Sequence, residues 1–415
     1  MSAMPLDGLR VLDLSKVLAG PLCAQYLGDM GADVVKVEAL AGGDETRHWP
    51  PFRADISAGP DAAGTAAGTG TIFLSANRNK RSLAIDLRSP AGLAVIHRLA
   101  ERADVVIESF GPGAAARLGV DAATLRAINP RLVCCNISGY GSVGPMRDGK
   151  GYDVILQAFC GMLAITGERD GPPVRSPFSP VDQATGLHAL IGILAALLER
   201  SRTGIGAAVE ASLFDSATGF LGYFLQGYWE RGTEPQRPGS GHESLCPYEA
   251  FDTADKPLIL GVANDPLWRS FCAVAGLQDI VDDERFRTNS ARVDNREQTV
   301  ALVRRALSLR SRDAWIADLG AAGIPCSPLH TLGELAAHPH TRASGMVFDY
   351  DDSRRGPMHA VAQPLRFDGA RPALRRPPPG HGDHGQEILR EAGFDEVEIE
   401  DLVAGGAVTL GKAPA

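Results

Sequence analysis

The chain has 415 residues, which is long for a single hydrophobic core and predicts two or three domains. Hydrophobic residues make up 44% and charged residues 22%, the balance of a soluble globular protein. The net charge of −9, with no basic stripe, argues against a nucleic-acid partner. An acidic chain can still bind an anionic ligand where lysines and arginines converge.

The cysteines and the apolar stretches bear on the compartment. The seven cysteines are an odd number without a Cys-x-x-Cys pair, which predicts buried, reduced thiols in a cytoplasmic protein. Residues 1–10 lack the basic-then-apolar pattern of a signal peptide. The longest uncharged apolar stretch, 183–198, is shorter than the ~20 residues that a membrane span needs. We therefore expect a buried helix there and no membrane association.

The first half of the chain alternates strands and helices. The sequence predicts strands at 9–14, 33–38, 83–87, 105–108 and 132–137, and helices at 21–30 and 91–103. An Ala/Gly-rich segment at 58–71 has no periodicity and is expected to be a surface insertion. Strands that alternate with helices of ten to fifteen residues predict an α/β fold with a doubly wound parallel sheet.

The pattern changes after a long helix that ends near residue 200. Strands are expected at 248–251 and 258–262, and helices at 266–275, 297–307 and 312–322. We therefore expect four parts: a large Rossmann-like domain at 1–205, a linker at 206–225, a small α+β domain at 226–330, and a segment at 331–415 that returns to the large domain. The Pro-rich residues 375–379 suit an extended arm.

The layout of the first strands resembles a dinucleotide-binding fold, with Glu38 at the end of the second strand. The intervening turn, Ser-Lys-Val-Leu-Ala-Gly-Pro at 15–21, lacks the glycine pattern that lets a backbone approach a pyrophosphate. Val17 and Leu18 would block that approach. The sequence therefore favours the architecture without a nicotinamide cofactor.

Asp182 is the strongest candidate for a catalytic carboxylate. It follows a Pro-rich loop at 177–181 and precedes an apolar helix at 186–200. An aspartate in this place is usually a helix N-cap, worth about 1 kcal/mol. The same position also suits catalysis, because the unpaired N–H groups of a helix start can stabilise a negative charge. The residues alone leave both interpretations open.

Each of several other polar residues is, taken alone, only weak evidence for a functional site. Tyr152 and Asp153 precede an apolar helix at 154–164 and can be a core aromatic and an N-cap. Lys80 and Arg81 stand before a strand and can simply be solvated. Ser109 and Phe110 follow a strand at its carboxyl end, where open α/β sheets bind ligands.

The order of these segments resembles the class III CoA-transferases, a family that includes formyl-CoA transferase and carnitine CoA-transferase. The similarity runs through residues 5–14, Ala-Gly-Pro at 19–21, Gly-Ala-Asp-Val-Val-Lys-Val-Glu at 31–38, and residues 43–47, 79–82 and 104–113. It continues through Gly-Tyr-Asp at 151–153, Asp182 with Thr185 and Gly186, the Arg-x-x-Thr-Gly-x-Gly turn at 200–206, and residues 323–328. The match covers nearly the whole chain.

The resemblance implies a transfer of coenzyme A between carboxylic acids through an aspartyl anhydride and an aspartyl-CoA thioester. It implies that Asp182 is the nucleophile, that Tyr152 lies in the active site, and that N–H groups around Asp182 and Gly186 stabilise the oxyanion. It implies CoA contacts from Val17, Leu18, Ala19, Arg47, Arg81, Ser109, Phe110, Arg117 and Lys150. It further implies an interlocked homodimer, with acyl-CoA as a substrate and no tightly bound cofactor.

The chain departs from formyl-CoA transferase in three places. Ala39 and Leu40 stand where that enzyme has two arginines, Leu18 replaces a glutamine, and the tetraglycine loop is absent. The segment 239–248 stands in place of this loop and resembles the members that use dicarboxylic acids, with succinyl-CoA as the expected donor. These departures leave the adenosine-phosphate contacts open.

Two alternative functions share this fold. The α-methylacyl-CoA racemases have a histidine at the place of Tyr152, and a tyrosine with a pKa near 10 cannot replace an imidazole in a proton shuttle at neutral pH. A non-catalytic CoA-binding protein is the other alternative. His381, Asp383 and His384 resemble a metal site in composition, but they match the ordinary C-terminal turn of the family, so no metal is expected.

Overall fold

The computed structural model describes residues 4–55 and 68–411. It contains two compact units. The first comprises Met1–Cys160, Pro177–Leu225 and Pro339–Ala415, and the second comprises Gly161–Ser176 and Gln226–His338. Most of the insertion expected at 58–71 lies outside the described residues. Its end forms β4 (Gly68–Gly70), which pairs with β3 (Phe52–Ala54), and Thr71 begins α2 (Thr71–Ala76).

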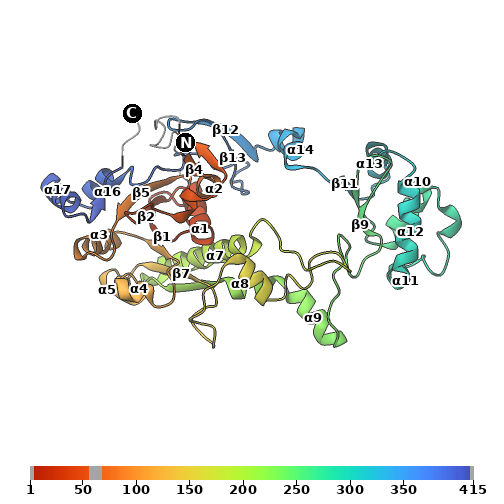
Figure 1. The fold of residues 1–415 in the computed structure, drawn as a ribbon, viewed down its shortest axis with the longest axis horizontal. Coiled ribbons are helices and arrows are strands. Elements are labelled where there is room, and N and C mark those ends of the chain that lie inside the picture. Colours follow the sequence, from red (N-terminus) through yellow and green to blue (C-terminus); the bar gives the residue numbers. More distant parts are fainter. Residues whose placement is uncertain (1–3, 56–67, 412–415) are drawn as a thin grey trace. The chain divides into compact units, whose positions relative to one another are not determined.

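A seven-stranded sheet forms the centre of the first unit (Figure 1). Its strands, in spatial order, are β14 (Val408–Thr409), β5 (Lys80–Ile85), β2 (Asp33–Glu38), β1 (Arg10–Leu14), β6 (Val105–Glu108), β7 (Val133–Ser138) and β8 (Ala208–Ser212). All neighbours are parallel except β14, which runs antiparallel to β5. The expected parallel sheet is confirmed.

The chain order of these strands creates a switch point beside β1. From β1 the chain builds β2 and then β5 on one side of it, and afterwards β6, β7 and β8 on the other side. Helices that leave β1 and β6 therefore cover opposite faces of the sheet. In open α/β sheets, ligands bind outside the carboxyl ends of the strands at such a point.

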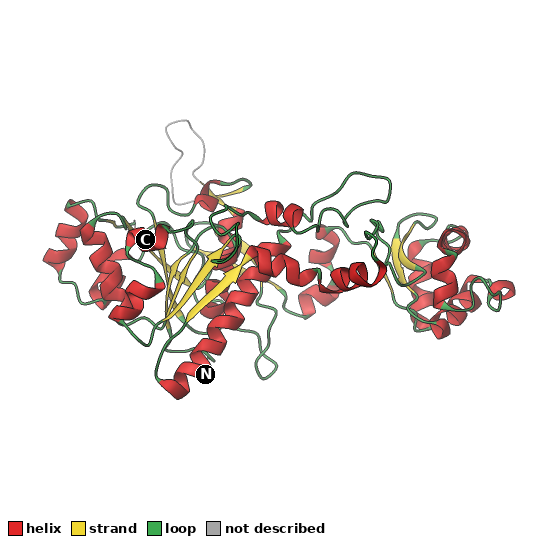
Figure 2. Cartoon of the chain, turned by 90° about the horizontal axis from the view of Figure 1, so that it is seen from below, coloured by secondary structure: helices red, strands yellow, loops and turns green. Residues whose placement is uncertain are grey.

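Helices cover both faces of this sheet, and the strands lie between them in Figure 2. On one face, Leu12 and Leu14 of β1 and Val35 and Val37 of β2 pack in a core with α3 (Pro90–Ala100), α5 (Ala122–Ile128), α16 (Gly385–Glu391) and α17 (Glu396–Ala404). On the other face, α1 (Ala19–Asp29) packs against α7 (Pro180–Thr203). Because side chains alternate along a strand, the residues between those core positions face α1.

Those alternate positions carry buried charges. Lys80 Nζ lies 2.8 Å from Asp13 Oδ2 and also donates to the carbonyl oxygen of Pro21 at the start of α1. Lys36 Nζ lies 2.9 Å from Asp44 Oδ2, and all four of these side chains are inaccessible to solvent or nearly so. Buried charges are tolerated when they are paired and hydrogen-bonded. The network therefore ties β1, β2, β5 and α1 together below the carboxyl ends of the strands.

Helix α7 differs from the sequence-based expectation in length. It has 24 residues. The turn that carries Asp182 precedes the apolar stretch, and the charged residues around Arg200 and Arg202 follow it. The helix ends at Gly204, which adopts a left-handed conformation. It is the one helix in the described part of the chain that is long and apolar enough, by length and composition alone, to cross a membrane. It packs against α1, β7, β8 and α8 (Leu213–Phe220), as the core helix of a globular unit does.

Residues 206–225 do not form the expected linker. They contain β8, which completes the sheet, and α8, and both belong to the first unit. Helix α9 (Gly222–Arg231) follows. The C-terminal part returns to the first unit through α15 (Pro339–Ala343), the hairpin of β12 (Val347–Asp352) and β13 (Gly356–Val361), α16, α17 and β14.

The second unit contains a small antiparallel sheet in the order β11 (Cys326–Pro328), β10 (Leu258–Gly261), β9 (Tyr248–Phe251). Its main helices are α10 (Asp265–Ala275), α11 (Asn289–Asp294), α12 (Arg296–Leu307) and α13 (Arg312–Ala321), and α14 (Leu332–Ala337) follows β11. Trp268, Phe271 and Phe251 lie in its core with residues of α12 and α13.

Candidate active site

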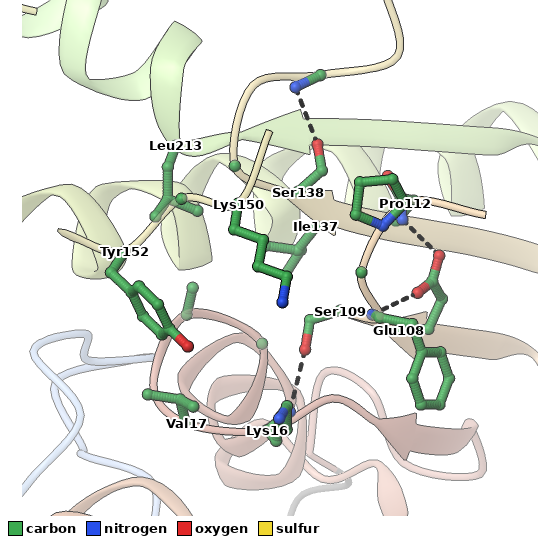
Figure 3. Close-up of a pocket in the computed structure, with 18 of the residues that line it drawn as sticks. Lys16, Val17, Glu108, Ser109, Pro112, Ile137, Ser138, Lys150, Tyr152 and Leu213 are labelled. Carbon is green, nitrogen blue, oxygen red and sulfur yellow. Dashed lines mark hydrogen bonds between the residues drawn. The ribbon is translucent and has the colours of Figure 1, made fainter. Parts of the chain in front are cut away.

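A cavity of about 560 Å³ opens at the carboxyl ends of β1, β6 and β7, at the switch point of the sheet. Its lining comes chiefly from five places within the first unit: the turn Lys16–Gly20 after β1, the segment Glu108–Gly113 at the end of β6, the residues 136–142 at the end of β7, the loop Arg147–Tyr152, and Asp182 in the first turn of α7. Figure 3 shows the side chains of Lys150 and Tyr152 directed toward the centre of this space.

The turn after β1 is held in an unusual backbone conformation. Val17 has φ 71°, which a β-branched side chain rarely adopts. The N–H of Lys16 donates to Ser109 Oγ at 3.1 Å, and Lys36 Nζ donates to the carbonyl oxygen of Ser15 at 3.1 Å. Strain of this kind persists where the surroundings fix it, and it is frequent in binding sites. The buried charge network thus positions the Val17 turn at the cavity.

This turn presents free backbone donors. The N–H groups of Leu18, Ala19 and Gly20, at the start of α1, donate to no acceptor in the described part of the chain. The same three residues line the cavity. They can therefore donate to an oxyanion or to a carbonyl group of a bound ligand.

The start of α7 is arranged differently. Asp182 lies in the first turn of the helix and is not its N-cap, which is Ser179. The N–H groups of Val181 and Asp182 donate to Asp153 Oδ2 at 2.8 and 3.1 Å, and the N–H of Gln183 donates to the Ser179 carbonyl oxygen. These donors are therefore occupied. The expectation that N–H groups around Asp182 stabilise an oxyanion does not fit this geometry.

The carboxylate of Asp182 has no hydrogen-bond or ion-pair partner among the described residues. Burial, and after it the negative charge of Asp153, raise the pKa of Asp182 to about 7. A carboxylate that lines a cavity without a partner is available to react with a bound molecule. A perturbed pKa in a cleft is typical of a functional site.

Gly186 follows Asp182 by one helical turn and does not line the cavity. A Cβ atom at this position would lie 2.6 Å from the carbonyl oxygen of Ala19. The missing side chain therefore lets the start of α1 approach α7. Gly186 brings the free N–H groups of α1 close to the helix turn that carries Asp182.

Two further residues of the cavity, Tyr152 and Lys150, are both exposed to solvent. Tyr152 is 58% exposed and occupies the N-cap position of α6 (Asp153–Phe159). Lys150 is exposed at the rim of the cavity. Ser109 and Phe110 also line the cavity, and the N–H of Phe110 donates to Glu108 Oε2 at 2.8 Å.

None of the three arginines expected to contact CoA lines this cavity. Arg47 is buried in an ion pair with Glu38 and stacks on Phe73, with its guanidinium 3.6 Å from the ring centroid. Arg81 binds Asp33, Glu387 and Glu391, and it lines a different hollow, among the first residues of β1 and β2. Arg117, on α4 (Ala114–Leu118), lies beside the cavity residue Gly113 without lining the cavity itself.

Several lining residues were not among the sequence-based candidates. These are chiefly Lys16, Glu108, Asn136 and Arg147. Burial raises the pKa of Glu108, which also accepts a hydrogen bond from Asn136. Glu108 and Asn136 stand within or at the end of neighbouring parallel strands, and this common position was the signal that could have identified them.

Comparison with known proteins identifies the family to which the chain belongs. Residues 6–385 match CoA-transferase family III. An acyl-CoA transferase of Fusarium pseudograminearum is 40% identical over 97% of this chain and 88% of its own length. The succinyl-CoA:glutarate CoA-transferase of Mus musculus is 35% identical over 98% and 91%. The crystal structure of a CAIB/BAIF family protein from Brucella suis is 36% identical, with a TM-score of 0.82 over 94% of this chain and 100% of its own.

The chain therefore belongs to CoA-transferase family III and is a CoA-transferase.

Proposed function

We propose that this enzyme transfers coenzyme A from succinyl-CoA to a dicarboxylic acid of four to six carbons, with Asp182 as the covalent nucleophile. The observation that carries the proposal is the partially buried Asp182 carboxylate, which lines the switch-point cavity and has no partner among the described residues. A carboxylate in this state can attack a bound thioester, and covalent steps then replace one difficult exchange.

The proposed cycle conserves every atom. An oxygen of Asp182 attacks the thioester carbonyl carbon, the C–S bond breaks, and CoA leaves as a thiolate, which gives a mixed anhydride. The thiolate then attacks Cγ of Asp182, and the donor acid leaves with one aspartyl oxygen. The acceptor carboxylate attacks the resulting aspartyl-CoA thioester, and the released thiolate completes the new acyl-CoA and restores Asp182. Each tetrahedral intermediate needs hydrogen-bond donors at its oxyanion.

The free N–H groups of Leu18, Ala19 and Gly20 are the donors that we assign to these oxyanions. They line the same cavity as Asp182, and Gly186 allows α1 and α7 to approach. Lys150 supplies positive charge at the cavity and suits the phosphates of CoA, whereas Lys16 pairs with Glu45 at 2.8 Å and Arg147 with Asp148 at 3.6 Å. Val17, Ser109 and Phe110 complete the proposed CoA contacts, whereas Arg47 and Arg81 are already held by carboxylates.

The dicarboxylate is proposed from two sources. The mouse relative is named for succinyl-CoA and glutarate. The segment 239–248, which resembles the dicarboxylate-using members, is a fixed loop: Arg296 donates to the carbonyl oxygens of His242, Glu243 and Leu245.

A substrate-pair screen tests this function. CoA exchange from succinyl-CoA is measured against a panel of dicarboxylates, hydroxy-dicarboxylates, monocarboxylates and oxalate. We expect the highest kcat/KM with a four- to six-carbon dicarboxylate. A higher kcat/KM with oxalate or with a monocarboxylate would contradict the substrate assignment.

We also propose a homodimer with interlocked chains. The first unit exposes apolar side chains on α6, α7 and α8, including Ile155, Phe159, Leu187, Ile191 and Phe220. Exposed apolar surface of this kind marks association sites. Light scattering is expected to give a dimer mass, and a tagged copy should not exchange subunits under native conditions. A cytoplasmic location is part of the proposal, because all seven cysteines are free thiols.

A further inference from the structure

Asp153 lies directly behind the proposed nucleophile. Its Oδ2 accepts the N–H groups of Val181 and Asp182, at 2.8 and 3.1 Å, and its Oδ1 accepts a hydrogen bond from Gln157. The residue is 8% exposed. The N-cap residue of α7, Ser179, makes no capping bond with its side chain. Asp153, 29 residues before Asp182, therefore takes over the role of the cap.

These contacts fix a negative charge next to Asp182. A carboxylate acts only as an acceptor when it is ionised, which matches the three donors that surround Asp153. A like charge next to a partly buried carboxyl group disfavours the ionised form of that group, here Asp182. The raised pKa of Asp182 is consistent with this repulsion, in addition to burial.

Other charged groups lie around the same space. The cavity is lined by the cations Lys16, Arg147 and Lys150 and by the acids Glu45, Glu108 and Asp148. From the neighbouring helix α8, Asp215 binds Ser212. None of them forms an ion pair or a hydrogen bond with Asp182 in the described part of the chain. Asp153 is the charge that contacts the backbone of Asp182 itself.

We propose that Asp153 is a positioning residue whose fixed negative charge favours the neutral, acylated state of Asp182 over its free carboxylate. The inference rests on the proposed function. When a donor acyl-CoA and the Asp182 carboxylate form the aspartyl-CoA thioester and a free acid, one C–S bond breaks and another forms. The negative charge leaves Asp182 with the released acid. Repulsion from Asp153 is relieved at this step.

Protonation and acylation of Asp182 remove the same charge from the same place. The loss of the Asp153 charge should therefore change both equilibria by the same factor. If the pKa of Asp182 falls by about one unit, the equilibrium constant for thioester formation falls about tenfold. A residue that only supported the fold would not link the two quantities.

The test uses the full-length chain and the variants Asp153→Asn and Asp153→Ser, which keep an acceptor oxygen but lose the charge. Each is incubated with succinyl-CoA and succinate at fixed ratios, and intact mass gives the fraction of chains that carry CoA. The pH dependence of thioester formation gives the pKa of Asp182. Asp121→Asn is the matched control, because Asp121 also accepts two backbone N–H groups at a helix start but does not line the cavity.

We expect about a tenfold lower equilibrium constant in both Asp153 variants, an equal downward shift of the Asp182 pKa, and wild-type values for Asp121→Asn. An unchanged equilibrium constant for thioester formation in a folded Asp153 variant would overturn this inference but not the proposed function. So would failure of both variants to fold, which would show a purely structural role. A wild-type chain without an adduct at Asp182 would overturn the proposed function first.

Discussion

A Cβ atom on Gly186 would lie 2.6 Å from the carbonyl oxygen of Ala19. This contact joins the two helices that carry the main parts of the site, because α1 offers the free N–H groups and α7 carries Asp182. The offending atom belongs to the backbone, so it cannot move aside as a flexible side chain can. The close packing of α1 and α7 therefore depends on this glycine.

The substitution Gly186→Ala should consequently destabilise the fold and weaken catalysis. We expect a loss of about 1–3 kcal/mol in the free energy of unfolding, measured with urea, and a lower kcat. Gly219→Ala on α8 is the control, because nothing lies within 4 Å of a Cβ atom there. Equal stability of the two variants would show that α1 can shift freely.

Replacement of Asp182 should stabilise the protein while it removes activity. The folded-state pKa of Asp182, about 7, is above its ordinary value of 3.8, so the ionised carboxylate costs stability that grows as the pH rises between these values. Asp182→Asn should raise the free energy of unfolding by about 2 kcal/mol near pH 8 and by little near pH 4. Calorimetry at both pH values measures the difference.

Asp121 is the control for this pH dependence, because its substitution should change the free energy of unfolding in the opposite direction. Hydrogen bonds from Thr124 lower the pKa of Asp121, so its ionised form is favoured in the folded protein. Asp121→Asn should destabilise the chain near neutral pH, and the loss should fade as the pH falls below the pKa of the unfolded aspartate. Stabilisation by Asp182→Asn at low pH as well as at high pH would contradict our account of the burial of Asp182.

Substitution of Lys150 should weaken the binding of acyl-CoA, whereas substitution of Arg81 should lower the stability of the fold. Lys150 lines the cavity, and Lys150→Gln should raise the KM for acyl-CoA about five- to tenfold through the loss of about 1 kcal/mol, with little change in stability. Arg81 binds three carboxylates elsewhere, and Arg81→Gln should lower the free energy of unfolding by about 1–3 kcal/mol. Steady-state kinetics and urea unfolding measure the two effects. A large KM effect in folded Arg81→Gln would restore its expected role in CoA binding.

The racemase alternative makes a distinct prediction. Tyr152 lines the cavity, and a phenol is a poor partner in a proton shuttle at neutral pH. Incubation of the enzyme with a 2-methylacyl-CoA in heavy water should therefore leave the α-proton in place on the time scale of CoA transfer. Mass spectrometry measures the incorporation. Deuterium at that carbon at a comparable rate would favour a racemase.

Sequence reasoning succeeded where local pattern decides structure. The strands 33–38, 105–108 and 248–251 agree with the structure residue by residue, since buried apolar runs between turns leave little choice. The sequence placed Asp182 at the start of an apolar helix, as its N-cap or as a nucleophile. In the structure the helix begins earlier, at Pro180, and its N-cap is Ser179, in a left-handed conformation that no propensity predicts.

The site required information that the sequence does not hold. The resemblance implied a CoA contact for Arg81, yet its partners Glu387 and Glu391 lie some 300 residues further along the chain. The bonds between Asp153 and the start of α7 likewise join residues that are far apart in sequence. Such contacts depend on how the helices pack on the sheet, which periodicity alone does not determine.

The nucleophile is the central claim, and trapping it is the most direct test. Incubation of the wild-type chain with succinyl-CoA and no acceptor, followed by intact mass and peptide mapping, should give a protein heavier by one CoA less one water. Borohydride or hydroxylamine should trap the adduct at Asp182, and Asp182→Asn should bind CoA without forming it. An adduct at Asp153 or Cys246, or full CoA transfer by Asp182→Asn, would contradict the account.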